Sequence, residues 1–250
     1  MNNNQDIKLI ALDMDGTLLN DAGEVSQENR DTIKEAQNSG IHVIVSTGRS
    51  LLTCIDYVKA LELSSYLITG NGSEIWDQNG ELVERTAVDP GHIQWLTDLA
   101  RKYQTKTWAA ATNRVWKREM PDDIEKHTWL KFGFEIQEDD IRNTILGHLH
   151  ARGQFFEISN SSPINIEVNA RGVNKARGID RVCSRLGLSM SQVMAIGDSL
   201  NDMSMIKAAG LGVAMGNAQE IVKDSANWVT FSNNDNGVAH AIEKWVLRGN

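Results

Sequence analysis

Residues 7–19 of the chain read IKLIALDMDGTLL, an apolar run followed by two acids and a glycine. The run over residues 7–12 contains one charge, Lys8, and predicts a buried strand that ends in a turn. Asp13 and Asp15 then lie together at the carboxyl end of a strand. Two carboxylates placed in this way can bind Mg²⁺, and one can attack phosphorus while the other transfers protons. The alternative for a short acidic pair is a solvated loop or a helix cap.

Apolar strand patterns alternate with helix patterns in the first and last thirds of the chain. Beyond residues 7–12, strands are predicted at residues 41–45, 66–69, 193–196, 211–215 and 228–231. Helices are predicted from Ser26 to Gly40 and at residues 51–63, 174–186, 201–209, 218–225 and 237–247. Strands separated by single helices form parallel sheets, which bind ligands at the carboxyl ends of their strands. The predicted fold class is α/β, with a mostly parallel sheet flanked by helices.

The middle of the chain, residues 84–168, has a different composition. It holds four of the seven Trp residues, and it has alternating runs at residues 155–158 and 164–168 that are typical of antiparallel strands. We interpret this segment as an α+β module inserted into the α/β domain. The predicted domains are a discontinuous core, residues 1–83 and 169–250, and an insert, residues 84–168.

Composition and charge narrow the possible partners. The 250 residues include 25 Lys and Arg against 33 Asp and Glu, a net charge of -8 that argues against a broad surface for nucleic acid. A few local cations can still bind one phosphate group. No apolar run approaches the ~20 residues of a membrane span, and Met1 to Lys8 is too polar for a secretory signal. Cys54 and Cys183 match no disulfide or zinc pattern, so we expect a soluble, cytoplasmic protein with no membrane partner.

Four motifs follow the order of the signatures of a known superfamily. DMDGTLL at residues 13–19 resembles the first signature of the haloacid dehalogenase superfamily, whose phosphatases use the first Asp as a nucleophile. STGR at residues 46–49 resembles the second signature, and Lys175 resembles the third. GDSLND at residues 197–202 resembles the fourth signature, GDxxND.

Two further motifs resemble one branch of this superfamily, the Cof-type sugar-phosphatase-like proteins. ITGNG at residues 68–72 matches the NG found in that branch, and GVAMGNA at residues 212–218 resembles its motif after the fourth signature. The branch carries a large cap of the C2 type between NG and the signature Lys. The insert at residues 84–168 lies at that place, so the resemblance implies a Rossmann-like core with an inserted α+β cap that reads the leaving group.

The resemblance also implies a role for each motif residue. The candidate catalytic residues are Asp13 as nucleophile and Asp15 as acid and base. The candidate phosphate-binding residues are Thr47, Lys175 and Asn201. The candidate metal residues, for Mg²⁺, are Asp13, Asp198, Asp202 and, through its backbone carbonyl, Asp15. Because carboxylates this close repel one another without the cation and Lys175, we expect the activity to depend on Mg²⁺.

The implied activity is hydrolysis of a small phosphorylated metabolite through an aspartyl-phosphate, by a monomer. Sugar phosphates, flavin precursors and pyridoxal phosphate are the expected kinds of substrate. A phosphosugar mutase with the same nucleophile is one alternative, and a regulator that binds a phosphometabolite without turnover is another. A dinucleotide-binding oxidoreductase is excluded, because the third glycine of residues 210–216 comes one place late and the stretch is itself a strand.

A basic and aromatic cluster in the insert has two possible interpretations. It consists of Trp108, Arg114, Trp116, Lys117 and Arg118. These side chains could meet a polar or ring-bearing substrate. We favour the alternative, in which the Trp residues belong to the core of the insert and the cations form a solvated face.

Overall fold

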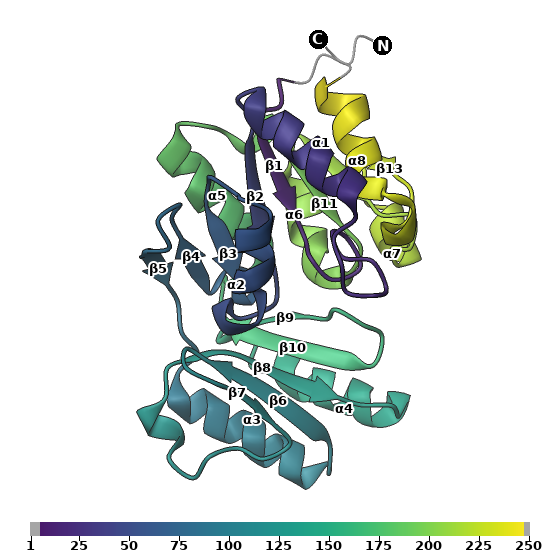
Figure 1. Ribbon diagram of the computed structural model, residues 1–250. Helices are drawn as coiled ribbons and strands as arrows, with labels where there is room; N and C mark the ends of the chain where they lie inside the picture. The colour runs from purple at the N-terminus through teal and green to yellow at the C-terminus, as the bar shows by residue number, and fades with distance from the viewer. Residues whose placement is uncertain (1–5, 248–250) are drawn as a thin grey trace.

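The apolar run that opens the chain forms β1 (Leu9–Leu12), whose four side chains are all buried. In the computed structural model, which describes residues 6–247, Leu9 and Ala11 belong to one apolar layer. Ile10 and Leu12 belong to the layer on the other side. A strand that is covered on both faces needs apolar side chains on both, which explains the continuous apolar run. β1 lies inside the larger of two sheets (Figure 1).

The larger sheet has eight strands in the order β13-β12-β11-β1-β2-β3-β4-β5. Its strands are β1, β2 (His42–Ser46), β3 (Leu67–Thr69), β4 (Glu74–Trp76), β5 (Leu82–Arg85), β11 (Val193–Gly197), β12 (Leu211–Ala214) and β13 (Trp228–Val229). The strands from β13 to β3 along that order are parallel, as predicted, whereas β4 and β5 are antiparallel. The β4–β5 hairpin was not predicted, because strands of three and four residues leave little pattern in the sequence.

Helices cover both faces of this sheet (Figure 1). α1 (Gln27–Asn38), α2 (Leu51–Ala60) and α8 (Gly237–Ile242) pack in the same apolar layer, and α8 continues into a π-helical turn, Glu243–Leu247. α5 (Lys175–Leu186) and α6 (Met203–Ala208) pack together, with α5 on the opposite face. α7 (Glu220–Lys223) follows β12. The predicted cap of the first helix is confirmed, since Ser26 Oγ accepts from the N–H of Asn29 at 3.1 Å.

The insert forms a five-stranded antiparallel sheet in the order β7-β6-β8-β10-β9. Its strands are β6 (Lys106–Ala111), β7 (Val115–Lys117), β8 (Trp129–Glu135), β9 (Phe156–Ser159) and β10 (Asn165–Ala170). α3 (Pro90–Lys102) and α4 (Asp139–His150) cover the face turned away from the core (Figure 1). Phe132 and Phe134 of β8 pack beneath these helices. The predicted α+β insert is thus a cap that places its sheet against the core.

The change from one sheet to the other falls two residues later than predicted at each end. β5 belongs to the larger sheet and ends at Arg85, and β10 belongs to the cap sheet and ends at Ala170. The predicted boundaries at residues 83/84 and 168/169 cut through both strands. β5 gives no apolar pattern because two of its four residues, Glu84 and Arg85, are charged. An ion pair between Arg85 and Glu74, at 2.6 Å, helps to hold it to β4.

The aromatic cluster of the cap divides between the two faces of the cap sheet. Trp116 packs in the apolar core of the cap beneath the helices, with the Arg114 guanidinium 4.1 Å from its ring centroid. Lys117 and Arg118 are exposed. The favoured interpretation is therefore right for these residues. It is wrong for Trp108, which lies on the opposite face and lines a cavity between cap and core.

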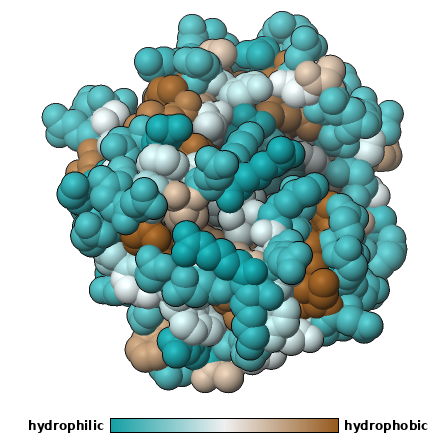
Figure 2. All heavy atoms as spheres, turned by 90° about the horizontal axis from the view of Figure 1, so that it is seen from below, coloured by the Kyte–Doolittle hydropathy of each residue, from teal (hydrophilic) through white to brown (hydrophobic). Residues whose placement is uncertain are grey.

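The outer face of the cap is mostly polar. Figure 2 shows the molecule from the cap side, where polar side chains cover most of the surface and apolar ones form small, separate groups. No helix within residues 6–247 is long and apolar enough to cross a membrane.

Candidate active site

The loop after β1 carries the first acid and closes over the end of β11. The N–H of Asp13 donates to the carbonyl of Ile196 at 3.0 Å, so the β1 ladder continues into the loop. Gly16 then turns the chain with a φ of +77°, which L side chains rarely adopt. A Cβ at this glycine would lie 2.6 Å from Oδ2 of Asp198. The Thr17 hydroxyl donates to Oδ1 of Asp198 at 3.3 Å, so the two strand ends form one site.

Three carboxylates converge at these strand ends. One oxygen each of Asp13, Asp198 and Asp202 lies within 4.8 Å of the other two. Burial and the charge of Asp202 raise the pKa of Asp13 well above its ordinary value. The same two causes raise the pKa of Asp198 to about 7. The cluster holds more negative charge than its surroundings neutralise, and its carboxylate oxygens fit a divalent cation such as Mg²⁺.

Lys175 is the buried cation of the site. It is the first residue of α5, whose N-cap is Asn174, with its side chain accepting from the N–H of Arg177. Its Nζ donates to Oδ1 of Asp13 at 2.5 Å and to Oδ1 of Asp202 at 2.6 Å. Burial disfavours the charged lysine, but attraction to the two carboxylates outweighs burial and raises the pKa of Lys175. Lys175 therefore stays protonated and fixes the orientation of Asp13.

Asp202 has both of its oxygens engaged. Oδ1 accepts from Lys175, and Oδ2 accepts from the backbone N–H groups of Asp198 and Ser199 at 2.9 and 3.0 Å. Asp202 is completely buried in the 3-10 turn η4 (Leu200–Asp202). Its contacts hold Lys175 and the loop after β11 in place.

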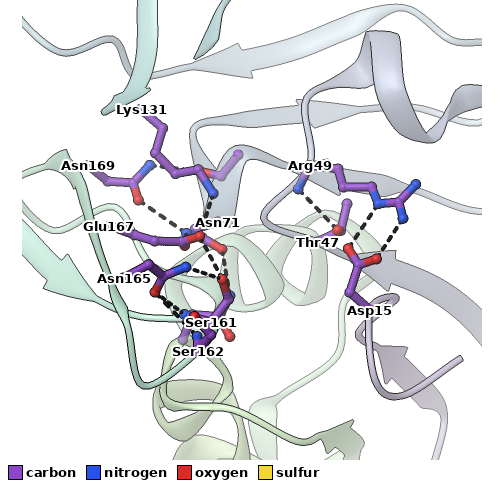
Figure 3. Close-up of polar contacts among 12 residues, drawn as sticks. Asp15, Thr47, Arg49, Asn71, Lys131, Ser161, Ser162, Asn165, Glu167 and Asn169 are labelled. Carbon is purple, nitrogen blue, oxygen red and sulfur yellow. Dashed lines mark hydrogen bonds and ion pairs between the residues drawn. The ribbon is translucent and has the colours of Figure 1, made fainter. Parts of the chain in front are cut away.

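The Asp15 carboxylate is not part of this cluster and points toward Arg49 (Figure 3). Arg49 donates from Nε to Oδ2 at 2.9 Å and from Nη2 to Oδ1 at 2.6 Å, and it also donates to the carbonyl of Thr53. The hydrogen bonds to Asp15 raise the pKa of Arg49. The structure thus groups the side chains of three of the four predicted metal residues. Arg49 belongs to a predicted motif, but sequence reasoning assigned it no role.

Thr47 and Asn201 are the other two predicted phosphate-binding residues. Thr47 directly follows β2, and Asn201 lies in η4, after β11. Thr47 is fully buried, and its hydroxyl accepts from the N–H of Arg49 at 3.1 Å. Asn201 lines the cavity, and its N–H donates to the carbonyl of Asn160 in the cap at 2.9 Å. Its side chain lies 3.4 Å from Oδ1 of Asn71. Asn201 therefore also joins the core to the cap.

Asn71 is the centre of a buried polar network between core and cap (Figure 3). It has a φ of +60°, and its side-chain N–H donates to Glu167 at 2.7 Å and to Asn169 at 3.2 Å, both on β10. Glu167 also pairs with Lys131 of β8 at 3.1 Å and accepts from Ser161 at 3.0 Å. These contacts lower the pKa of Glu167 although burial opposes its charge. The network fixes how the cap sits over the core.

Sequence reasoning missed the cap members of this network. Glu167 and Asn169 alternate with the buried Ile166 and Val168, so the pattern placed them on the polar face of a strand. A polar face of an antiparallel sheet is ordinarily solvated. This face is buried because the core packs against it, and the pattern of a single strand does not reveal that packing.

We predict that Asn71 matters both through its side chain and through its backbone. Asn71→Gly keeps the positive φ but leaves buried partners unsatisfied, so it should lower the free energy of unfolding by about 1–3 kcal/mol. Asn71→Ala should cost roughly 1 kcal/mol more, because an L side chain is strained at this φ. Urea unfolding of the two variants measures both effects. A glycine variant as stable as the wild type would contradict the importance of the network.

A cavity of about 290 Å³ lies between the core and the cap. The core lines it with Asp13, Asp15 and Arg49, and the cap lines it with Trp108 and Lys131. The nucleophile candidate is therefore accessible from a space that the cap closes on the other side. A cavity of this size suits a small molecule.

The fold and the acids at its strand ends define a haloacid dehalogenase-type phosphatase. The chain belongs to the haloacid dehalogenase-like hydrolases, whose family model matches residues 10–146 and 117–242. It is 57% identical over 242 residues to the 5-amino-6-(5-phospho-D-ribitylamino)uracil phosphatase YcsE of Bacillus subtilis (strain 168), with 97% of each chain covered. It is 32% identical to phosphatase YwpJ of the same organism, with 95% of this chain and 99% of the relative covered. The expected phosphoric monoester hydrolase is confirmed.

Solved structures share the whole fold, including the cap. A haloacid dehalogenase-like hydrolase from B. subtilis superposes with a TM-score of 0.88 at 25% identity, covering 96% of this chain and 100% of that one. The subclass IIB sugar phosphatase BT4131 superposes with a TM-score of 0.84 at 21% identity, covering 95% and 98%. The predicted α/β core with an inserted α+β cap is thereby confirmed.

Proposed function

We propose that the chain hydrolyses small phosphate monoesters with Mg²⁺, through a phosphoryl group carried on Asp13. The observation that carries this proposal is the position of Asp13, which lines the cavity while Lys175 holds one of its oxygens at 2.5 Å. A carboxylate nucleophile has to be oriented and ionised to attack phosphorus. Lys175 supports both requirements.

The proposed reaction has two steps. An oxygen of Asp13 bonds to phosphorus as the ester P–O bond breaks, and the leaving oxygen takes a proton from Asp15. A water then attacks the phosphorus of the aspartyl-phosphate, Asp15 takes a proton from that water, and the bond to Asp13 breaks. Phosphate leaves, and both acids return to their starting states. Thr47, Lys175 and Asn201 are the proposed contacts for the phosphoryl oxygens.

Asp15 has to change partners during this cycle. Both of its oxygens accept hydrogen bonds from Arg49, so this pair must open and the carboxylate must take up a proton from solvent before it can donate to the leaving oxygen. The Asp15 side chain is 57% exposed, so packing does not block its rotation. Its exposure also means that the ion pair adds little to stability.

The acidic cluster supports the proposed metal site. Asp13 and Asp198, with the backbone carbonyl of Asp15, are the proposed ligands, and Asp202 supports them through Lys175 and the loop N–H groups. Burial and the charge of Asp202 raise the pKa values of Asp13 and Asp198 even with Lys175 present, so a bound cation would offset the cost of their charges. Bound Mg²⁺ would draw charge from a phosphoryl oxygen and favour the ionised form of these acids.

We propose 5-amino-6-(5-phospho-D-ribitylamino)uracil as the substrate. The support is the 57% identity to a phosphatase of that name over 97% of both chains. The cavity between core and cap, about 290 Å³, suits a leaving group of small-metabolite size.

Phosphate release by the purified chain tests this proposal. With Mg²⁺ present, kcat/KM for the ribitylaminouracil ester should exceed the values for glucose 6-phosphate and pyridoxal phosphate by about tenfold or more. A chelator should abolish hydrolysis, and added Mg²⁺ should restore it. Equal kcat/KM for the three esters would contradict the substrate, and full activity in chelator would contradict the metal.

A further inference from the structure

The cap sheet turns one face toward the core, and that face carries an unassigned set of side chains. On β6, Ala109 and Ala111 pack in the cap core beneath the helices. Trp108 and Ala110 alternate with them and line the cavity. On β8, Phe132 and Phe134 likewise point to the helices, whereas Lys131 lines the cavity. Side chains alternate between the two faces of each strand, so Trp108 and Lys131 lie on the face of the cap sheet that is turned toward the core.

Trp108 lies flat across the neighbouring strand. Its partner in the register between β6 and β8 is Gly133. A Cβ at Gly133 would lie 2.2 Å from Cε2 of the indole, so only glycine leaves room for the ring there. The indole is half-buried and rests against the sheet as one wall of the cavity.

Lys131 is buried but keeps donor capacity. Its side chain is 3% exposed, and Glu167 Oε1, at 3.1 Å, is the one acceptor that the structure records for it within residues 6–247. Its Nζ also lies 4.6 Å from the centroid of the Trp108 ring. An ammonium group has three N–H donors, so one carboxylate contact leaves donors for a ligand in the cavity. Asn71 and Ser161 also donate to Glu167, so both of its oxygens are engaged within the protein.

Gly48 brings this lysine close to the phosphate-binding loop of the core. A Cβ at Gly48 would lie 3.0 Å from Nζ of Lys131 and 2.9 Å from Oδ1 of Asn71. Gly48 stands between Thr47 and Arg49, whose guanidinium holds Asp15. The Lys131 ammonium is thus placed beside residues 47–49, the segment that carries the proposed phosphate contact Thr47.

We propose that Trp108 and Lys131 form the site that reads the leaving group. The inference rests on the proposed function and adds which kind of leaving group the cap selects. A flat ring of the leaving group packs against the Trp108 indole, since aromatic rings stack with a substantial free-energy gain. Lys131 donates to a hydroxyl oxygen on the chain that links the ring to the phosphate. The preferred substrate class is a phosphate ester of a hydroxylated chain that bears a ring.

Two esters that share the ribityl chain and the phosphate, one with the ring and its linking amine and one without, test the role of Trp108. They are 5-amino-6-(5-phospho-D-ribitylamino)uracil and D-ribitol 5-phosphate, which shares the chain and the phosphate. Their Kd values are measured by calorimetry with Mg²⁺ in an Asp13→Asn background, which should bind without turnover. Trp108→Leu should lower the preference for the ring-bearing ester by roughly 5- to 150-fold.

Trp116→Leu is the matched control. Trp116 lies on the same hairpin but on the opposite face of the sheet, since it pairs with Ala109 in the register. This variant should leave the ratio of the two Kd values unchanged. An unchanged ratio in the Trp108 variant, or an equal loss in both variants, would overturn the proposed stacking.

The role of Lys131 is tested with the double variant Lys131→Met/Glu167→Gln. Both residues are changed because they form a buried ion pair, and changing one alone would leave the other charge buried without its partner. This double variant should weaken binding of both esters by about tenfold or more and leave their ratio unchanged, because both carry the hydroxylated chain. Thermal unfolding checks that it is folded, and unaltered Kd values in the folded variant would remove Lys131 from the site.

Turnover is measured separately with the wild-type chain. If neither ester is hydrolysed while Kd depends on Trp108 and Lys131, the proposed reaction is wrong and the leaving-group site stands. If both esters are hydrolysed while neither variant changes Kd as described, the leaving-group site is wrong and the reaction stands.

Discussion

Asp13→Asn should reduce phosphate release by about 10⁴- to 10⁶-fold, the loss typical of removing a covalent nucleophile. The amide cannot form a stable ester bond to phosphorus. The fold should persist, because Lys175 keeps its ion pair with Asp202 at 2.6 Å. The substitution also removes a buried carboxylate that Asp202 and Asp198 repel. Steady-state kinetics measures the loss, and thermal unfolding measures the stability.

Acid quenching during turnover gives a second readout for Asp13. The wild-type chain should carry one phosphoryl group on the peptide that contains residue 13, and the Asn variant should carry none. Asp98→Asn is the control, because Asp98 lies on the exposed side of α3, where it contacts only surface side chains, Arg101 at 3.4 Å and Gln94 at 3.0 Å, among the residues described. A fully active Asp13→Asn chain would remove Asp13 from the nucleophile role.

The acids of the candidate site could be predicted because their positions depend on short stretches of sequence. Asp13 follows Leu12, and Asp198 follows Ile196 and Gly197. The parallel register pairs Leu12 with Ile196, so the two acids emerge side by side at one edge of the sheet. An apolar run that ends in Asp is visible in the sequence, and adjacent parallel strands bring such ends together.

Lys131 and Glu167 could not be predicted in the same way. Each lies on the polar face of a strand whose other face is apolar, which ordinarily indicates a solvated position. Their contact depends on the register between β8 and β10, where Glu167 pairs with Gly133, two residues beyond Lys131. Their burial depends on the core docking above the sheet. Both conditions are tertiary, so no local pattern encodes them.

Lys175 was harder to predict from the sequence than the acids, but easier than Lys131 and Glu167. A lone lysine carries no local signal, and only the order of the surrounding motifs pointed to it. The structure supplies the physical reason for its position, because the side chain is completely enclosed and its two partners come from the loop after β1 and from η4. Asn174 caps α5, so the helix begins at Lys175.

Lys175→Met should be among the most damaging single substitutions in the chain. The change leaves Asp13 and Asp202 buried without their shared cation, and breaking a buried ion pair in this way costs about 3–5 kcal/mol. Phosphate release should fall by about 10²- to 10³-fold or more, because the nucleophile loses its orientation and a charge that neutralises the transition state. Urea unfolding and steady-state kinetics measure the two losses.

The double variant Lys175→Met/Asp202→Asn separates stability from catalysis. Removing the second charge should recover part of the lost stability, since fewer buried carboxylates remain uncompensated, whereas activity should stay low. Lys106→Met is the control for removing a lysine, because its pair with Glu135 is exposed and weak, at 3.4 Å. Wild-type stability and activity in Lys175→Met would show that the buried lysine neither balances the acids nor orients Asp13.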